Sequence, residues 1–276
     1  MPPAPDVSAR RRAFRQMHAS GCFVIPNPWD PGSAKYLEKL GFQALATTSS
    51  GAAWRHARAD GQMTVEEVLV HLREMVDATP LPLNADFEAG YAADAEGVAR
   101  NVRLAVETGV AGLSIEDSTG DPEAPLRDIA TAVERMRAAR RAIDDSGGES
   151  LLVGRAENFI VGRPDLADAI RRLQAYAEAG ADCLYAPGIR TREQIAAVVA
   201  AVAPKPVNLL IGFATELTLA DIAGLGVRRV SVGGALARTA WGGFMRTAQA
   251  IAQEGRFDGF ATAAAGAELN AFFRNA

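Results

Sequence analysis

Residues 105–117 read AVETGVAGLSIED, which is the end of an amphipathic helix, then a glycine, then a short apolar strand. Three other stretches repeat this order: LEKLGFQALATT at 37–48, YAEAGADCLYAPG at 176–188 and IAGLGVRRVSVGG at 222–234. The glycine in each stretch suits the left-handed backbone position that follows a helix. Strands that are apolar throughout are typical of a parallel sheet that is buried on both faces. The repetition therefore predicts parallel strands joined by helices.

Four more strands fit between these stretches, at residues 23–26, 81–85, 151–154 and 206–209. Helical patterns separate the strands, at residues 31–40, 64–78, 95–108, 128–143, 164–179, 192–202 and 219–224. Eight strands that alternate with helices over about 250 residues indicate an α/β fold of the (β/α)8 TIM barrel type. The alternative is a doubly wound open sheet, which expects a glycine-rich phosphate turn after its first strand. The sequence VIPNPWDPGSA at that place has no such turn, and the barrel is favoured.

No linker-like stretch divides the chain, so we predict one barrel domain over residues 1–276. Residues 235–276 are predicted to be a C-terminal helical extension, because a barrel needs only one helix after its eighth strand. The extension carries surplus apolar side chains, at Trp241, Phe244, Phe272 and Phe273. They either pack under the barrel or are exchanged between subunits as swapped helices.

The composition limits the chemistry that the chain can perform. It contains three His, two Cys and three Lys, whereas Asp, Glu and Arg are plentiful. Two cysteines, Cys22 and Cys183, cannot make a disulfide framework or a Cys-rich zinc site. The hydrophobic fraction of 49% is that of a globular chain with a sizeable core. Any chemistry is therefore expected to depend on carboxylates and arginines.

The charge pattern argues against nucleic-acid and membrane partners. The net charge is −4, and a nucleic-acid-binding protein usually shows a basic patch. The N-terminal run of Arg10, Arg11, Arg12 and Arg15 is interpreted as the solvated start of a helix. The N-terminus lacks the apolar core of a signal peptide, and the longest apolar run, 195–203, is far shorter than the roughly 20 residues of a membrane span. We expect a cytoplasmic protein.

Three further features are interpreted from their positions. Residues 49–63 are the longest stretch without a helix or strand pattern, and so long a loop in a compact domain is usually functional. His18 and His71 lie on predicted helices and are expected at the surface or at an interface. His56 lies in the loop WRHARAD and is the one His placed to face the mouth of the barrel. It is either an acid/base group or a solvent-facing loop residue.

In such barrels the active site lies at the carboxyl ends of the strands. Asp86 and Glu88 follow the third strand, Glu116 ends the fourth, and Arg155 follows the fifth. Three converging carboxylates repel one another, and a hard cation that prefers oxygen ligands removes that repulsion. A cation can polarise a carbonyl while an arginine binds a carboxylate through two hydrogen bonds. The alternative for each residue is structural: a turn cap for each acid, and an ion pair for Arg155.

Six motifs together resemble the isocitrate lyase/phosphoenolpyruvate mutase superfamily, from Asn27 to the C-terminal helices. PLNADFEAGY, starting at Pro82, is similar to D-x-D-x-G-Y and places Asp86 and Glu88. SIED at 114–117 is similar to I-E-D and places Glu116. GRAENF at 154–159 resembles A-R-T-[DE] and places Arg155 as the group that binds the substrate carboxylate.

The other three motifs place groups around this centre. TSSGAAW resembles the S-G element, which implies that backbone amides at Ser50, Gly51 and Ala52 hold a carboxylate. ADGQMTVEEVL at 59–69 is similar to P-D-x-G-x-x-T-x-[DE] and makes Asp60 an outer ligand of the metal's waters. VNLL at 207–210 carries Asn208, which matches a substrate-binding asparagine at a strand end.

The resemblance implies an Mg²⁺ enzyme, with Mn²⁺ as a substitute. Asp86 would bind the ion, while Glu88, Glu116 and Asp60 would hold its waters. The implied reaction is the cleavage of a C–C bond in a small 2-keto or 2-hydroxy di- or tricarboxylate through a pyruvate-type enolate, by a lyase or decarboxylase. The alternatives are a C–P bond enzyme (a phosphonomutase or phosphonopyruvate hydrolase) and a non-catalytic barrel that binds a carboxylate metabolite. The resemblance also implies a homotetramer built as a dimer of helix-swapped dimers.

The sequence departs from the family at the loop after the fourth strand. Isocitrate and methylisocitrate lyases carry K-[KR]-C-G-H there, and its Cys is the acid/base. STGDPEAPLRD at 118–128 contains no Cys, Lys or His, and it also lacks the mutase loop's Lys and Asn. Pro187 replaces the family's glutamate after the sixth strand. The predicted catalytic set is therefore Arg155, Glu116, Asp60 and His56, with the proton donor left open.

Overall fold

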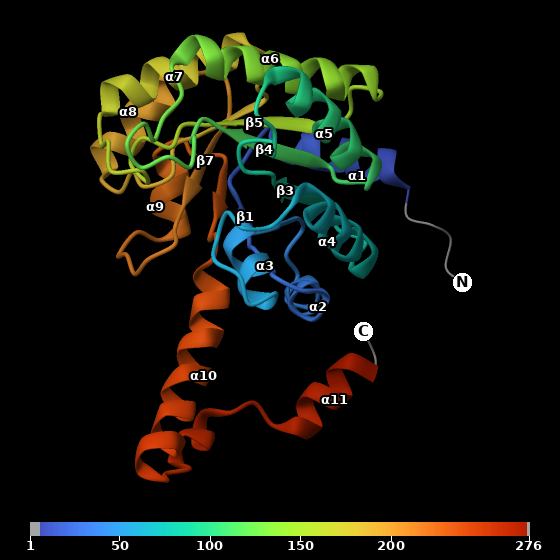
Figure 1. Cartoon of the computed structure of the whole chain (residues 1–276), viewed down its shortest axis with the longest axis vertical. Helices are drawn as coiled ribbons and strands as arrows, with labels where there is room; N and C mark the ends of the chain where they lie inside the picture. Colours follow the sequence, from blue (N-terminus) through green and yellow to red (C-terminus); the bar gives the residue numbers. More distant parts are fainter. Residues whose placement is uncertain (1–5, 275–276) are drawn as a thin grey trace. The chain divides into compact units, whose positions relative to one another are not determined.

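Eight parallel strands form a nearly closed barrel in the computed structural model, which describes residues 6–274 (Figure 1). The strands are β1 (Phe23–Ile25), β2 (Leu45–Ala46), β3 (Leu83–Asp86), β4 (Gly112–Glu116), β5 (Leu151–Arg155), β6 (Cys183–Tyr185), β7 (Val207–Leu210) and β8 (Arg229–Ser231). Hydrogen-bonded neighbours follow the order β1-β8-β7-β6-β5-β4-β3-β2. Next to β1 and β2, the amide of Ala46 donates to the carbonyl of Pro26 at 3.1 Å, and Asn27 donates to the carbonyl of Thr47 at 2.7 Å. The predicted TIM barrel is confirmed.

Prolines explain where three strands differ from their predicted bounds. Pro26, Pro82 and Pro206 were included in the predicted strands but lie outside β1, β3 and β7. Proline has no N–H to donate to a neighbouring strand. Each of the three still accepts a hydrogen bond through its carbonyl, from Ala46, Leu45 and Leu184 respectively.

Helices connect successive strands on the outside of the barrel (Figure 1). They are α2 (Pro31–Lys39), α4 (Val65–Ala78), α5 (Ala95–Glu107), α6 (Ile129–Asp145), α7 (Leu166–Glu178), α8 (Arg192–Val202) and α9 (Leu219–Gly224). The predicted capping box is present before α4, where Thr64 and Glu67 each accept the other's backbone N–H. The glycines of the repeated pattern have positive φ angles: 88° at Gly41, 94° at Gly109, 103° at Gly180 and 88° at Gly226. The main hydrophobic core lies between the strands and these helices, with fully buried side chains such as Leu72, Val102 and Leu173.

The helix expected at the N-terminal arginines is α1 (Val7–Met17), and Arg12 and Arg15 are exposed as expected, but Arg10 and Arg11 are not. Arg10 and Arg11 are each only 8% exposed. Arg10 donates to the carbonyls of Val76 and Thr79 at the end of α4, at 3.2 and 3.1 Å. Arg11 donates to the carbonyls of Val106 and Val110 at the end of α5, at 2.7 and 3.1 Å. Helix ends leave carbonyls without intrahelical partners, and these two arginines are buried because they satisfy them.

His71 is buried, so the expectation of a surface position is wrong for it, and His18 is partly buried. His18 follows α1, and its Nδ1 lies 2.8 Å from the carbonyl oxygen of Phe14. Burial, together with the charge of Arg229, lowers the pKa of His18 to about 3. His71 on α4 is 3% exposed, and neither ring nitrogen has a hydrogen-bond partner in the described structure. Burial lowers the pKa of His71 to about 4.

The stretch 49–63 is not structureless, because it begins with helix α3 (Ser49–Arg55). Thr48 caps this helix, and its side chain accepts the N–H of Gly51. Ala52 and Ala53 are buried and give the short helix its packing face. The cap and the burial of these two small apolar residues stabilise the short helix.

The chain divides into two compact units, of which the second begins at Ala235. The second unit contains α10 (Ala235–Glu254), a 3-10 helix η1 (Asp258–Thr262) and α11 (Gly266–Arg274), which agrees with the predicted helical extension. Its apolar side chains are largely exposed, at 40% for Trp241 and 62% for Phe244. Their packing under the barrel or exchange between subunits stays a prediction. Residues 1–5 and 275–276 of the predicted domain lie outside the described residues, and among those that are described no helix is long and apolar enough to cross a membrane.

Candidate active site

The carboxyl ends of β3, β4 and β5 border a cavity of about 540 Å³. Strand pairing sets this arrangement, because Glu116 on β4 lies directly opposite Arg155 on β5, and Asp86 on β3 lies opposite Ser114 on β4. The residues that line the cavity are Ser49, Asp60, Gly61, Glu88, Glu116, Ser118, Gly120, Asp121, Pro122, Pro125, Arg155, Glu157, Ile160 and Val161. The acidic strand ends and Arg155 therefore meet at the mouth of the barrel.

Arg155 is the centre of the polar network. Its Nε and Nη2 donate to the two carboxylate oxygens of Glu157, the second at 3.1 Å. Its Nη1 donates to Oδ1 of Asp86 at 3.1 Å and lies 3.0 Å from Oε2 of Glu116. Burial lowers the pKa of the guanidinium, but the surrounding carboxylates raise it well above its ordinary value. Arg155 is thus a fixed positive charge whose orientation depends on three acidic residues.

Asp86 and Glu88 leave β3 in a constrained turn. Asp86 accepts the backbone N–H of Ser49 at 3.0 Å, which links β3 to the start of α3. Glu88 has a φ of 43°, a left-handed conformation that is uncommon outside glycine. Its carboxyl group accepts the hydroxyl of Tyr91 at 2.7 Å. Burial raises the pKa of Glu88 to about 7, and the charges of Asp86 and Glu116 act in the same direction.

Glu116 and Asp60 line the cavity together with Glu88, whereas Asp86 contacts Arg155 but is not itself a lining residue. Ser118 donates its hydroxyl to Glu116. Burial raises the pKa of Glu116, and the nearby Arg155 opposes this shift. Burial also raises the pKa of Asp60, while a hydrogen bond with Ser49 opposes it. The cavity thus holds more carboxyl groups than its one guanidinium can pair with.

The donor set fits a hard cation. The candidate ligands are all carboxylate oxygens, which Mg²⁺ prefers, and Mg²⁺ commonly retains several waters with one or two direct carboxylates. Within residues 6–274, no three His, Cys, Asp or Glu side chains form a ready cluster that could hold a metal directly. The chemistry of the site therefore fits an ion bound directly by Asp86, with Glu88, Glu116 and Asp60 acting through water.

The predicted substrate-binding residues other than Arg155 are not among the residues that line the cavity. Ser50, Gly51 and Ala52 form the first turn of α3, but of this turn only Ser49 lines the cavity. The hydroxyl of Ser50 lies 3.1 Å from that of Thr48. Ser49 was not among the predicted site residues, although its backbone N–H donates to Asp86 and its side chain is hydrogen-bonded to Asp60.

His56 and Asn208 are not brought into the cavity. His56 is the exposed residue that caps the C-terminus of α3. Asn208 is 1% exposed and bonded inside the barrel, donating to Ser231 at 3.0 Å and accepting from Arg229 at 2.8 Å. Both of its polar atoms are therefore occupied by barrel residues.

Glu157 has more contacts in the site than the sequence predicted. Its carboxylate receives two donors of Arg155, and its backbone N–H donates to Asp117 Oδ1 at 2.8 Å. Asp117 is 1% exposed and also accepts from Arg172 and Tyr176 on α7, at 3.0 and 2.5 Å. The sequence signal was the placement of Glu157 two residues after Arg155, on the same side of an extended segment.

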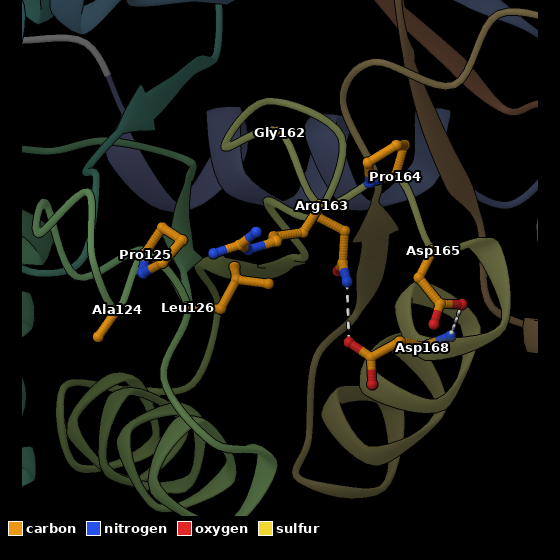
Figure 2. Close-up of a pocket in the computed structure, with 9 residues that line it drawn as sticks. Ala124, Pro125, Leu126, Gly162, Arg163, Pro164, Asp165 and Asp168 are labelled. Carbon is orange, nitrogen blue, oxygen red and sulfur yellow. Dashed lines mark hydrogen bonds between the residues drawn. The ribbon is translucent and has the colours of Figure 1, made fainter.

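A second cavity, of about 610 Å³, lies between the loop after β4 and the start of α7 (Figure 2). Its charged residues are Arg163, Asp165 and Asp168, and Pro125 lines both cavities. Asp168 is committed to structural contacts, since it accepts from Asn158 at 2.8 Å and from Arg172 at 2.6 Å. Figure 2 shows the side chain of Arg163 extending over Leu126. The acidic strand ends do not reach this cavity, and the first cavity is the candidate active site.

Comparisons with known proteins show the family of this chain. A family model described as phosphoenolpyruvate phosphomutase matches residues 14–252. Oxaloacetate decarboxylase of Paraburkholderia xenovorans (strain LB400) is 32% identical over 234 residues, which cover 81% of this chain and 75% of that protein.

Solved structures extend the similarity to the whole fold. A protein of Burkholderia cenocepacia J2315, described only as a lyase/mutase, is 44% identical with a TM-score of 0.94 over 98% of both chains. The structure of 2,3-dimethylmalate lyase has a TM-score of 0.83 and 26% identity, over 97% of this chain and 94% of that one. The chain therefore belongs to the phosphoenolpyruvate mutase/isocitrate lyase superfamily and is an enzyme of this group of lyases and mutases.

Proposed function

We propose that this enzyme cleaves a C–C bond of a small 2-keto or 2-hydroxy acid in an Mg²⁺-dependent reaction, through a pyruvate-type enolate. The observation that carries the proposal is the contact of Arg155 Nη1 with Asp86 and Glu116, at 3.1 and 3.0 Å. It puts a guanidinium and an all-oxygen acidic cluster at one end of the same cavity. When bound, Mg²⁺ (or Mn²⁺) would polarise the carbonyl of the substrate.

The residues of the chain have separate tasks in this proposal. Asp86 holds the ion, and Glu88, Glu116 and Asp60 orient its waters. The hydrogen bonds to Glu157 and Asp86 use three of the five N–H groups of Arg155, and Glu116 lies 3.0 Å from Nη1, so the second N–H of Nη2 is the one left to bind a substrate carboxylate. Glu157 keeps the guanidinium in place. A role for the amides of Ser50, Gly51 and Ala52 stays a prediction, since of this turn Ser49 alone lines the cavity. As the C–C bond breaks, Arg155 stabilises the negative charge that develops on the enolate.

Decarboxylation is the favoured form of this reaction. It requires a group that withdraws electrons from the breaking bond, and afterwards one proton, which solvent can supply. It does not require the loop cysteine that the sequence lacks between residues 118 and 128. The similarity to an oxaloacetate decarboxylase over 81% of the chain supports this choice.

The proposal also covers the cellular location and the oligomeric state of the enzyme. We place it in the cytoplasm as a homotetramer, a dimer of helix-swapped dimers, with a small carboxylate substrate and no nucleic-acid or membrane partner. The exposed apolar side chains of α10 and α11, such as Phe244 at 62%, support an assembly that covers them. A sedimentation mass equal to the 29.1 kDa of one chain would contradict the assembly.

A substrate panel tests the reaction. Oxaloacetate, methylisocitrate, phosphonopyruvate and phosphoenolpyruvate are each incubated with enzyme and Mg²⁺, and pyruvate release and phosphorus NMR are followed. We expect pyruvate from oxaloacetate or from another C–C substrate, and loss of activity when EDTA is added. Turnover of the phosphorus compounds alone would assign a C–P reaction instead. Activity that is unchanged in EDTA would contradict the metal dependence.

A further inference from the structure

The second cavity, between the loop after β4 and the start of α7, has charged residues of its own (Figure 2). It shares Pro125 with the candidate active site but none of the charged side chains there. Three of its lining residues are charged, namely Arg163, Asp165 and Asp168, and the others are Asn158 and small or apolar residues. A volume of about 610 Å³ is in the range of cavities that enclose a small organic molecule.

Asn158 brings a buried acceptor without a donor to this cavity. It is 1% exposed, and its Nδ2 donates to Oδ2 of Asp168 at 2.8 Å. An ionised carboxylate only accepts hydrogen bonds, so this contact fixes which end of the Asn158 amide is the oxygen. That oxygen, Oδ1, has no hydrogen-bond partner in the described structure. A buried acceptor in this condition loses free energy, which the N–H group of a ligand would recover.

The guanidinium of Arg163 is available to bind an anion. Its side chain extends over Leu126 (Figure 2) and makes no hydrogen bond or ion pair within residues 6–274. Its backbone is held in place, because the N–H of Arg163 donates to the carbonyl of Asn158 at 2.7 Å and its carbonyl accepts the N–H of Asp165 at 2.7 Å. A guanidinium on such a fixed turn can bind a carboxylate through two hydrogen bonds.

Asp165 supplies the opposite charge. As the N-cap of α7 it accepts the N–H of Asp168 through Oδ1 at 2.9 Å, and its Oδ2 has no partner among the described residues. Arg163 and Asp165 are two residues apart in the chain, but Figure 2 shows their side chains on opposite sides of the pocket. Asp168 is already bonded to Asn158 and to two arginines of α7. Asp165 is therefore the acid that can pair with a cationic group of a ligand.

These groups fit a ligand that carries one positive and one negative charge. A protonated amine would donate to Oδ1 of Asn158 and pair with Asp165, and a carboxylate would pair with Arg163. Because Arg163 and Asp165 lie on opposite sides of the pocket, the two charged groups of the ligand are separated by a short alkyl chain (Figure 2). The apolar lining at Pro125 and Leu126 can cover the methylene groups of that chain.

We propose that this cavity is a second ligand site, which binds a small ω-amino acid with its carboxylate at Arg163 and its amine at Asn158 and Asp165. The site is separate from the proposed reaction, since its binding groups do not line the candidate active site and need no Mg²⁺. A bound ligand would also hold the segment 157–163, because the carbonyl of Asn158 accepts the N–H of Arg163.

The test compares four compounds of equal carbon number. 5-Aminovalerate carries both charged groups, valerate lacks the amine, and pentylamine lacks the carboxylate. Norvaline is an isomer of 5-aminovalerate in which the amine is next to the carboxylate. Dissociation constants are measured by calorimetry on the full chain at pH 7 without Mg²⁺. We expect 5-aminovalerate to bind at least about fivefold more tightly than each of the others, because it alone can reach both charged sides of the pocket.

Variants assign each end of the ligand. Arg163→Ala is expected to weaken the binding of 5-aminovalerate about fivefold and to leave that of pentylamine unchanged. Asp165→Asn keeps a side chain that can cap α7 but removes the charge, so we expect about threefold weaker binding of 5-aminovalerate and no loss for valerate. Arg141→Ala is the matched control, since Arg141 is an exposed arginine of α6 that lines neither cavity. It is expected to keep the affinity of the unmodified chain.

Hydrogen exchange locates the bound ligand. Saturating 5-aminovalerate is expected to slow the exchange of the backbone N–H of Arg163, which donates to the carbonyl of Asn158, and to leave the N–H groups of α4 unchanged. Slower exchange elsewhere in the chain, with the segment 157–163 unaffected, overturns the location of the site.

The remaining outcomes bear on the ligand class. Failure of 5-aminovalerate to bind, or binding no tighter than that of valerate and pentylamine, overturns a ligand with two charges. Equal binding of norvaline overturns the separation of the two groups. An affinity unchanged in Arg163→Ala overturns the role of Arg163. The substrate panel tests the proposed reaction independently, because these measurements use neither its substrates nor Mg²⁺.

Discussion

The backbone N–H of Glu157 donates to Oδ1 of Asp117 at 2.8 Å, across 40 residues of sequence. Glu157 in turn holds Arg155 through two hydrogen bonds. The other carboxylate oxygen of Asp117 accepts from Arg172 and Tyr176 on α7. The orientation of the active-site arginine is therefore connected to a helix on the outside of the barrel.

Asp117→Ala tests this connection. It removes the acceptor of the Glu157 N–H and one partner of Arg172, so we expect kcat to fall and the free energy of unfolding to drop by about 3 kcal/mol. Urea unfolding and steady-state kinetics measure the two effects. Asp117→Asn retains an acceptor for the N–H and should recover part of kcat. Full kcat in Asp117→Ala would show that Arg155 is oriented without Asp117.

Tyr176→Phe is expected to have a smaller effect than Asp117→Ala. It removes one hydrogen bond to Asp117 but leaves the bonds from Glu157 and Arg172. We expect a loss of about 1 kcal/mol in the free energy of unfolding and nearly unchanged kcat. A loss of kcat as large as that of Asp117→Ala would contradict the view that the Glu157 contact is the one that matters for turnover.

Asp86→Ala is expected to abolish both turnover and metal binding. Asp86 is the carboxylate that contacts both Arg155 and the N–H of Ser49, so its removal takes away the proposed direct ligand and one anchor of Arg155. The loss of such an electrostatic group typically lowers kcat at least about 10²-fold. Calorimetric titration with Mg²⁺ and pyruvate release provide the measurements. Asp145→Ala, at an exposed position on α6, is the control. Retained Mg²⁺ affinity in Asp86→Ala would exclude Asp86 as the direct ligand.

Arg155→Lys should lower kcat/KM at least about 10²-fold although it preserves the charge. Lysine cannot form the paired contact with Glu157 and still reach Asp86, because its ammonium group lacks the planar fork of arginine. The same kinetic assay and a competition titration with oxalate would measure the effect. Unchanged oxalate affinity together with normal kcat/KM would mean that charge alone is sufficient at this position.

The pH dependence of stability should report on His71. Burial holds the pKa of its folded form at about 4, below the ordinary value of 6.5. Above pH 6.5 the ring is neutral in both states, so it makes no pH-dependent contribution there. As the pH falls from 6.5 to 4, the unfolded chain binds a proton that the folded chain refuses. Stability is lost over this window, by about 3 kcal/mol at most.

His71→Leu is expected to remove this loss. Neither ring nitrogen has a hydrogen-bond partner in the described structure, so the variant should be at least as stable as the unmodified chain at pH 7. His18, with a pKa of about 3, remains and should still cause a decline below pH 6.5. Urea unfolding at several pH values compares the two slopes. Identical slopes in both proteins would contradict the assignment to His71.

Local sequence signals were sufficient to predict the barrel fold. Gly41, Gly109, Gly180 and Gly226 all adopt the left-handed conformation that the pattern required, because a helix end and a glycine are neighbours in the chain. The same locality explains the capping box of Thr64 and Glu67. The sequence also put Asp86, Glu88, Glu116 and Arg155 near strand ends, and parallel pairing brings such ends to one edge.

Contacts between segments that are distant in the sequence determined the features that local patterns could not predict. The burial of Arg10 and Arg11 depends on carbonyls about 70 to 100 residues away, which no local pattern contains. Asn208 is occupied by Arg229 inside the barrel, although its place near the end of a strand indicated the mouth. The sequence by itself determined the order of strands and the acidic character of the site. Only the tertiary structure decided which acid holds Arg155 and which residues line each cavity, because side chains are oriented by partners that folding brings together.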